Sequence, residues 1–321
     1  MRRALAGAVA GVAAALLIAG GCGGDLGVGP TGDWKPGTAQ YTLPVGGLTR
    51  TFLVHVPARR PQTTTGALRP YPLLLLLHGS NGQGANVEYA SRMDSISEVH
   101  GYVVAYPNAY RGAGGLYPAD WNAGTCCGEP QREGIDDLGF LSAIVATASA
   151  QLPIDARRVY VAGFSSGALM AYHAACQRAA TFAAVGIVEG SIDDDRCAPA
   201  TPVPLVAVQG TADQSVTYQD PSLTAPPKPV PAAAAGLPPS VQFWTAVNGC
   251  SAARDSAVSA HVRQTSFTRC AGADVTLYTI DGGQHGWPGE PPDGLGSQEP
   301  MVELNFSRAM IAFFNRHRRP Q

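Results

Sequence analysis

The second half of the chain contains a serine, an aspartate and a histidine whose order suits nucleophilic catalysis. Ser165 is the centre of a Gly-Phe-Ser-Ser-Gly pentapeptide at 163–167, and Asp213 and His285 follow it along the chain. A serine hydroxyl is a weak nucleophile until a neighbouring base takes its proton, and a carboxylate must hold a histidine base in the correct tautomer. We therefore predict that these three residues form a catalytic triad able to transfer an acyl group.

The sequence around Ser165 predicts the tight turn that such a nucleophile needs. An apolar, β-branched and aromatic run at 158–162 indicates a buried strand, and 168–175 indicates a helix. A G-x-S-x-G pentapeptide between a strand and a helix is typical of a nucleophile elbow, which presents the serine at the edge of a sheet. The helix N-terminus also favours negative charge at this point.

Asp213 and His285 occupy equivalent places after predicted strands. Asp213 follows an apolar strand at 204–208, and His285 follows one at 275–280. Loops at the carboxyl ends of parallel strands share one edge of a sheet. The order serine, acid, histidine is the one that accompanies this kind of elbow. Asp281 is the weaker candidate for the acid because it ends the strand that carries the histidine.

An oxyanion formed at Ser165 would need two backbone donors. One is the N–H of Ser166, the residue after the nucleophile. We assign the second to Ser80, in the loop 78–82 that follows an apolar strand at 73–77.

The remaining histidines and an acidic run have simpler explanations than catalysis. We expect the histidines to be solvated or packed, with His173 pointing away from the site along its helix, and the acidic run to lie in a solvated loop. A cation site at the acidic run is the alternative that we consider weaker. These residues are His173, His261, His317 and the run Asp193, Asp194 and Asp195.

Further segments predict a sheet covered by helices. Strands are expected at 40–43, 50–56, 102–106 and 184–188, and helices at 135–150 and 302–315. The last helix has an apolar face formed by Phe306, Met310, Phe313 and Phe314. Apolar strands that alternate with helices indicate an α/β fold with a mostly parallel central sheet and helices on both faces. The proline-rich segment Pro221 to Pro239 interrupts this pattern, either as a surface insertion or as a rim over the active site.

The N-terminal region is predicted to lie outside the folded domain. Residues 1–21 combine a basic start with an apolar run too short for a convincing membrane span, which is typical of a signal peptide. Small residues followed by Cys22 resemble a bacterial lipobox, so we expect Cys22 to be lipidated. Ordinary cleavage near Ala19 is the alternative. Residues 22–37 would then be a flexible tether, and 38–321 the catalytic domain.

The cysteines indicate an oxidising compartment. Six of the seven remain once Cys22 is assigned to a lipid, an even number that suits disulfides. We predict a disulfide between Cys250 and Cys270. Two of the other four are adjacent, and we expect each of these to pair with a distant cysteine rather than with its neighbour. The four are Cys126, Cys127, Cys176 and Cys197.

Composition limits the classes of partner. A formal net charge of −2 argues against nucleic acid or an acidic polymer as partner, and 45% hydrophobic residues are enough for a sizeable core. The cysteines form no C-x-x-C motif and the histidines no cluster, so we expect no metal site.

The motifs occur in the order of a known esterase family. They are Leu-His-Gly-Ser at 77–80, Tyr-Pro-Asn-Ala at 106–109, Trp-Asn-Ala-Gly-Thr-Cys-Cys-Gly at 121–128, Asp-Asp-Leu-Gly-Phe at 136–140, the elbow, Gly-Thr-Ala-Asp at 210–213 and Gly-Gln-His-Gly-Trp-Pro-Gly at 283–289. Over roughly residues 40–317 the chain resembles the secreted poly(3-hydroxybutyrate) depolymerase-like esterases, which are close to feruloyl and acetylxylan esterases.

That resemblance implies an α/β-hydrolase fold, a triad of Ser165, Asp213 and His285, and no cofactor. It also implies that Trp287 and the loop of Trp121 flank the acyl pocket, with core packing as the alternative for both tryptophans.

The sequence departs from many extracellular depolymerases because we find no separate polymer-binding domain and expect a membrane tether. We therefore expect a secreted or lipid-anchored serine ester hydrolase acting on poly(3-hydroxybutyrate) or other hydroxyalkanoate oligomers. Cleavage of feruloyl or acetylxylan esters is the alternative, and a non-catalytic surface binding module is a rival of another class. We expect a monomer that contacts a membrane only through its lipid anchor.

Overall fold

The computed structural model of the protein describes residues 33–112, 115, 118–220, 225–289 and 300–320. The predicted signal peptide and Cys22 lie outside the described residues. The predicted tether ends too late, because Trp34 is buried and packs against Tyr41 and Phe52, with ring centroids 5.4 and 6.1 Å apart. The folded domain therefore begins before residue 38.

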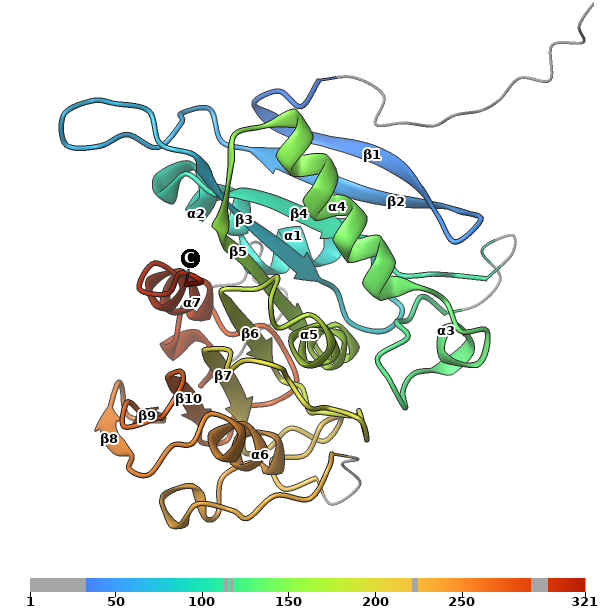
Figure 1. The fold of residues 1–321 in the computed structure, drawn as a ribbon. Helices are drawn as coiled ribbons and strands as arrows, with labels where there is room; N and C mark the ends of the chain where they lie inside the picture. The colour runs from blue at the N-terminus through green and yellow to red at the C-terminus, as the bar shows by residue number, and fades with distance from the viewer. Residues whose placement is uncertain (1–32, 113–114, 116–117, 221–224, 290–299, 321) are drawn as a thin grey trace, which may run out of the picture.

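The described strands form a single sheet (Figure 1). They are β1 (Gly37–Val45), β2 (Leu48–Val56), β3 (Tyr71–Leu77), β4 (Val103–Pro107), β5 (Ile154–Phe164), β6 (Ala184–Val188), β7 (Leu205–Gly210), β8 (Arg254–Ala257), β9 (Val262–Phe267) and β10 (Val275–Ile280). Their order is β1-β2-β4-β3-β5-β6-β7-β10-β9-β8. The strands from β4 to β10 in that order pair in parallel, and the outer strands pair antiparallel.

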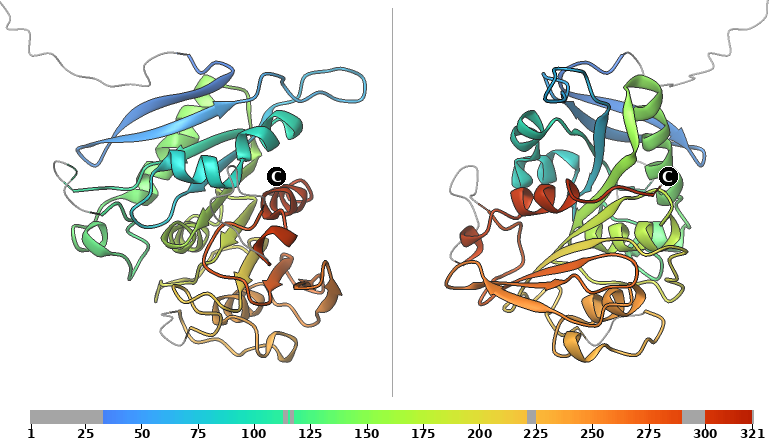
Figure 2. Two further views of the ribbon diagram at one scale, coloured as in Figure 1. Left: turned by 180° about the vertical axis from the view of Figure 1, so that it is seen from behind. Right: turned by 60° about the vertical axis from the view of Figure 1, so that its left-hand side comes forward.

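Helices cover both faces of the sheet, which confirms the predicted α/β architecture. They are α1 (Gly84–Ser91), α2 (Met93–His100), α3 (Gly128–Arg132), α4 (Asp137–Gln151), α5 (Ser166–Gln177), α6 (Pro239–Val247) and α7 (Phe306–Phe314). One face packs against α4, α5 and α6, and the other against α1, α2 and α7 (Figures 1 and 2). Within the described residues no helix is both long and apolar enough to cross a bilayer.

Strand β3 shows why the central strands are apolar throughout. Leu73, Leu75 and Leu77 belong to the core under α4 and α5, whereas Leu74 and Leu76 belong to the core under α1, α2 and α7. Side chains alternate between the two faces of a strand, so a strand with a helical layer on each face must be apolar at every position.

Several predicted elements are confirmed, with small shifts at their ends. The early strands pair antiparallel around Gly46 and Gly47. Helix α4 begins two residues later than expected because the Asp136 carboxylate caps it, accepting the N–H of Gly139 at 2.7 Å. The predicted apolar face of α7 is buried at all four positions. Helices α1 and α2 and the hairpin of β8 and β9 were not predicted, because their short segments carry many polar residues.

The disulfides correct one prediction. Cys250 and Cys270 are bonded, as expected. The adjacent Cys126 and Cys127 are bonded to each other, and Cys176 to Cys197, so the expected cross-pairing was wrong.

Proximity in the fold explains this pairing. Cys176 lies near the end of α5, and its Cα is 5.0 Å from that of Cys197, an ordinary separation for a disulfide. The adjacent cysteines lie instead in a loop closed by its own backbone, in which the Cys127 N–H donates to the Trp121 carbonyl at 2.9 Å.

The proline-rich segment packs beside α6 where the structure describes it. Residues 221–224 lie outside the described part. Ala234, in a short 3-10 helix, is fully buried, and the Gln219 side-chain amide donates to the Gly236 carbonyl at 2.7 Å. The segment is therefore anchored to the core, and its two predicted roles remain predictions.

Candidate active site

Ser165 occupies the predicted elbow between β5 and α5. Its backbone is in an unusual region, with φ of 55° and ψ of −124°, which a non-glycine residue adopts only where the surrounding structure enforces it. A Cβ on Gly163 would lie 2.1 Å from the Gly167 carbonyl oxygen, and one on Gly167 would lie 2.4 Å from the His78 carbonyl oxygen. The two flanking glycines are therefore required by the close approach of the backbone.

Three loops bring Ser165, Asp213 and His285 together at the carboxyl edge of the sheet. The hydroxyl of Ser165 lies 3.0 Å from His285 Nε2, and His285 Nδ1 lies 2.8 Å from Asp213 Oδ2. The ionised carboxylate only accepts hydrogen bonds, so Nδ1 carries the proton and Nε2 accepts the serine O–H. Solvent reaches the triad from the side of the histidine and not from that of the acid, because the His285 side chain is 22% exposed whereas that of Asp213 is fully buried.

Hydrogen bonds hold Asp213 in its ionised form. Burial raises its pKa, but hydrogen bonds from His285, from the Val216 N–H and from Glu189 outweigh burial and bring the pKa below its ordinary value. Its Oδ1 atom accepts the N–H groups of Ser215 and Val216 at 2.8 and 3.0 Å. The carboxylate is thus fixed by the turn in which it lies.

The loops that carry the acid and the histidine are bound to each other. The Ala212 N–H donates to the Gly283 carbonyl at 2.9 Å, and the Thr211 N–H donates to the Ile280 carbonyl at the same distance. A Cβ on Gly210 would lie 2.3 Å from the Gly283 oxygen. This close backbone contact sets the spacing between the carboxylate and the imidazole.

The two predicted oxyanion donors belong to segments that adjoin the nucleophile. Ser166 is the first residue of α5, so its N–H has no acceptor within the helix. Ser80 follows Gly79, on which a Cβ would lie 3.0 Å from the Cβ of Ser165. The Ser80 hydroxyl donates to Asp120 Oδ2 at 3.1 Å, which fixes this loop.

His78 is a structural residue of the same loop that sequence reasoning left without a role. Its Nδ1 lies 2.7 Å from the Gly79 carbonyl, and its Nε2 accepts the Ala109 N–H at 3.0 Å. Burial lowers the pKa of His78 to about 4, so the ring is neutral and can both donate and accept. His78 thereby ties the loop after β3 to the loop after β4.

Both tryptophans that the resemblance placed beside the substrate are buried and hydrogen-bonded, which favours the packing alternative. Trp121 is fully buried, and its indole N–H donates to the His78 carbonyl at 2.9 Å. Trp287 is 7% exposed, and its N–H donates to the Ser307 hydroxyl at 2.9 Å. The aromatic side chain beside the histidine is instead the half-buried Phe164, whose ring centroid lies 4.8 Å from that of His285.

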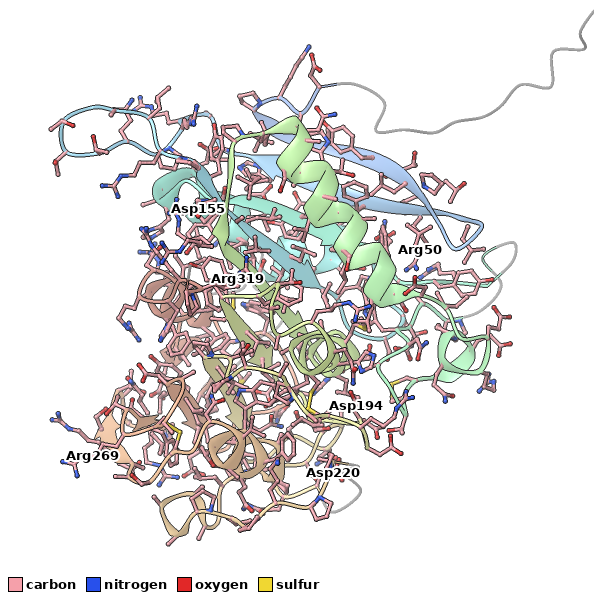
Figure 3. All side chains as sticks on the ribbon, in the orientation of Figure 1. Arg50, Asp155, Asp194, Asp220, Arg269 and Arg319 are labelled. Carbon is pink, nitrogen blue, oxygen red and sulfur yellow. A yellow bond between two sulfur atoms is a disulfide. The ribbon has the colours of Figure 1, made fainter. Side chains whose placement is uncertain are left out.

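A buried ion pair supports the segment of Trp121. Arg50 donates to Asp137 Oδ1 at 2.7 Å, and Asp137 Oδ2 accepts the Asn122 N–H at 2.8 Å. Both side chains are almost fully buried, and Arg50 also lies 4.3 Å from the centre of the Phe140 ring (Figure 3). This network positions the loop that packs beneath the site.

The other histidines lie outside the triad. His173 is buried, and its Nδ1 bonds to Asp194 at 2.8 Å (Figure 3). Our prediction of a solvated acidic run is therefore wrong for Asp194, because the fold brings it against α5. His261 bonds to Glu303, and His317 bonds to the Phe313 carbonyl. Asp281 accepts the Thr211 hydroxyl at 3.1 Å rather than contacting the imidazole.

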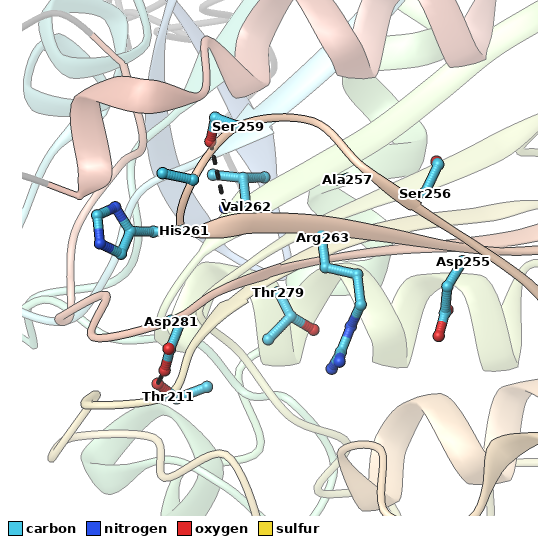
Figure 4. A pocket seen from close by; sticks show the side chains of 11 residues that line it. Thr211, Asp255, Ser256, Ala257, Ser259, His261, Val262, Arg263, Thr279 and Asp281 are labelled. Carbon is cyan, nitrogen blue, oxygen red and sulfur yellow. Dashed lines mark hydrogen bonds between the residues drawn. The ribbon is translucent and has the colours of Figure 1, made fainter.

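A hollow of about 490 Å³ lies at the same edge of the sheet, between the hairpin of β8 and β9 and the ends of β7 and β10 (Figure 4). Its walls include His261, Arg263 and Asp281, and Thr211 lies at its border, two residues before Asp213. The hollow therefore adjoins the loop of the acid rather than the nucleophile.

The chain is similar in sequence to known esterases. Residues 61–277 match the family described as esterase PHB depolymerase. Feruloyl esterase B of Piromyces equi is 28% identical over 219 residues, which is 67% of this chain and 39% of that protein. The putative esterase NocK of Nocardia uniformis subsp. tsuyamanensis is 27% identical over 271 residues, 78% of this chain and 74% of that protein.

Among solved structures, an acetyl xylan esterase from Aspergillus awamori superposes with a TM-score of 0.60 at 15% identity, covering 86% of this chain and 99% of that one. The superposition agrees with the α/β-hydrolase fold. The chain spans well under half the length of the Piromyces enzyme.

Proposed function

The chain belongs to the esterase PHB depolymerase family, and from this premise we propose that it is a carboxylic ester hydrolase that works through an acyl-enzyme on Ser165. The observation that carries the proposal is the continuous hydrogen-bonded chain from the Ser165 hydroxyl through His285 to Asp213. All three triad positions are filled, which argues against a non-catalytic binding module.

The proposed mechanism assigns a role to each residue of the site. His285 Nε2 takes the proton as Ser165 Oγ attacks the ester carbonyl, and the N–H groups of Ser166 and Ser80 stabilise the oxyanion. The histidine then gives its proton to the leaving alcohol. Water, activated by the same histidine, attacks the acyl-enzyme and releases the acid. Asp213 keeps the imidazole in the required tautomer and stabilises its positive charge.

We propose hydroxyalkanoate oligomers, such as those of 3-hydroxybutyrate, as the substrate class. The description of the family supports this choice. The burial of both Trp121 and Trp287 supports it as well, because neither indole offers an aromatic wall for a feruloyl group.

Feruloyl or acetyl esters of polysaccharides are the second candidate. The names of similar proteins favour it, since these include feruloyl esterase B and an acetyl xylan esterase. Phe164 beside His285 is the aromatic side chain that could contact such an acyl group.

We also propose that the mature protein lies outside the cytosol and is held at a membrane by a lipid on Cys22. Three disulfides support an oxidising compartment. The intact mass of protein extracted from membranes would test the anchor. A mass that includes acyl chains on Cys22 supports it, and a free thiol or cleavage at another residue contradicts it.

The decisive experiment for the function compares initial rates on a 3-hydroxybutyrate trimer and on methyl ferulate. Ser165→Ala is the control and should abolish both activities while leaving the melting temperature unchanged. Preference for the trimer supports the first substrate class, and preference for ferulate supports the second. If Ser165→Ala retained normal turnover, or if a serine-reactive phosphonate failed to label Ser165, the proposed mechanism would be wrong.

A further inference from the structure

Glu189 is a buried carboxylic side chain next to the triad for which the mechanism above has no use. It follows β6 directly, is fully buried, and has a left-handed backbone with φ of 47°. The adjacent Val188 carbonyl accepts the Ser165 N–H at 3.0 Å, and the Glu189 N–H donates to the Val208 carbonyl at 3.1 Å. The segment at the end of β6 thus touches both the nucleophile and the strand that leads to the acid.

The Glu189 side chain reaches toward Asp213. Its two carboxyl oxygens lie 3.1 and 3.0 Å from the Gly210 N–H, three residues before the acid. The Asp213 N–H in turn donates to the Gly210 carbonyl at 3.5 Å, which brings the Glu189 and Asp213 carboxyl groups close enough for a hydrogen bond between them to shift the pKa of each. Two oxygen-only groups can share a hydrogen bond only if one of them carries a proton.

The surroundings decide which carboxyl group carries that proton. Asp213 already accepts hydrogen bonds from His285 and from two backbone N–H groups, which favour its charged form. Burial raises the pKa of Glu189 well above its ordinary value, and the neighbouring charge of Asp213 raises it further. Glu189 is therefore the neutral partner and the donor.

We propose that Glu189 is a positioning residue that stays protonated and donates its O–H to the Asp213 carboxylate, fixing the acid that orients His285. The inference rests on the proposed function of Ser165. The Glu189 O–H takes up part of the negative charge of Asp213, so the carboxylate stabilises the protonated imidazole less than a carboxylate without this donor would. It also limits small rotations of the carboxylate that would tilt the imidazole relative to the Ser165 hydroxyl while leaving its bond to Nδ1 in place.

Two substitutions distinguish the hydrogen bond that Glu189 donates from the packing of its side chain. Glu189→Gln keeps a donor for Asp213 and an acceptor for the Gly210 N–H, whereas Glu189→Leu fills the space without either. A hydrogen bond to a charged group is worth enough to change a rate by about 10- to 100-fold. We expect Glu189→Leu to lower kcat by about that factor with KM changed less than about twofold, and Glu189→Gln to retain most of kcat.

The pH dependence of kcat/KM distinguishes hydrogen-bond donation by Glu189 from a purely structural role, because a purely structural role would not shift it. Without the donor, Asp213 carries more negative charge and holds the protonated histidine more strongly. The acid limb of the kcat/KM profile should therefore move to higher pH in Glu189→Leu and stay in place in Glu189→Gln. The exposed Glu133, changed to leucine, is the matched control and should alter neither quantity.

An infrared difference spectrum between the wild-type protein and Glu189→Gln tests whether the Glu189 carboxyl group is protonated. This test remains available even if Glu189→Leu fails to fold. The carbonyl stretch of a protonated carboxylic acid should be present at neutral pH in the wild type and absent from the variant. Absence of that band, or wild-type kcat and acid limb in a folded Glu189→Leu variant, overturns the inference. An active Ser165→Ala variant would refute the proposed function instead, and the infrared band would still report on Glu189.

Discussion

Replacing Asp213 with asparagine should reverse the tautomer of His285. Asp213 Oδ1 accepts two backbone N–H groups, from Ser215 and Val216, at 2.8 and 3.0 Å. The amide oxygen of an asparagine must take this position, because an NH₂ group there would face two donors. Its NH₂ group would then face His285 Nδ1, which would have to become the acceptor.

The proton of the imidazole would consequently move to Nε2, which lies 3.0 Å from the Ser165 hydroxyl. A protonated Nε2 cannot accept the serine proton. We expect kcat to fall by about 10³- to 10⁴-fold, the scale on which serine hydrolases respond to the wrong tautomer. That loss corresponds to about 4 to 5.5 kcal/mol of transition-state stabilisation. Initial rates on a soluble chromogenic ester, at matched melting temperature, would measure it.

Asp281→Asn is the matched control for this prediction. Asp281 ends the strand that carries His285, but it bonds to the Thr211 hydroxyl and not to the imidazole. Its substitution should change kcat by less than about threefold, because exposed hydrogen bonds are worth about 1 kcal/mol or less. The reasoning fails if Asp213→Asn stays within about tenfold of wild type, or if the two variants lose activity equally.

Two further predictions concern the elbow and the stability of the domain. Gly167→Ala should prevent phosphonate labelling of Ser165 and destabilise the fold by about 3 kcal/mol, because the new Cβ would lie 2.4 Å from a backbone oxygen. Gly286→Ala, whose nearest neighbour would be 4.0 Å away, should leave both unchanged, and equal effects of the two would contradict the steric argument. Burial and the nearby Asp94 raise the pKa of Glu88 to about 7 from 4.5, so the folded protein loses stability as pH rises through this window. Glu88→Gln should therefore unfold at higher urea concentration than wild type at about pH 8 but not at about pH 4, and a shift of the same size at both values would rule out this linkage.

The sequence determined the features that depend on neighbouring residues in the chain. Apolar strands and the G-x-S-x-G turn are local patterns, so they predicted the parallel sheet and the elbow. The triad was also predictable from spacing, because loops at the carboxyl ends of parallel strands must meet at one edge. The order of Ser165, Asp213 and His285 then left few alternatives.

Tertiary structure decided the contacts between residues that are distant in sequence. The pairing of Cys176 with Cys197, the burial of Trp121 and the bond between His173 and Asp194 depend on how helices and loops pack against the sheet. A signal for Glu189 was present, since an acidic residue follows a buried strand at the edge where the site lies. Its role could be inferred only from the structure, because which of two carboxyl groups carries a proton depends on the distance between them and on their burial. Neither quantity can be derived from the residue order alone.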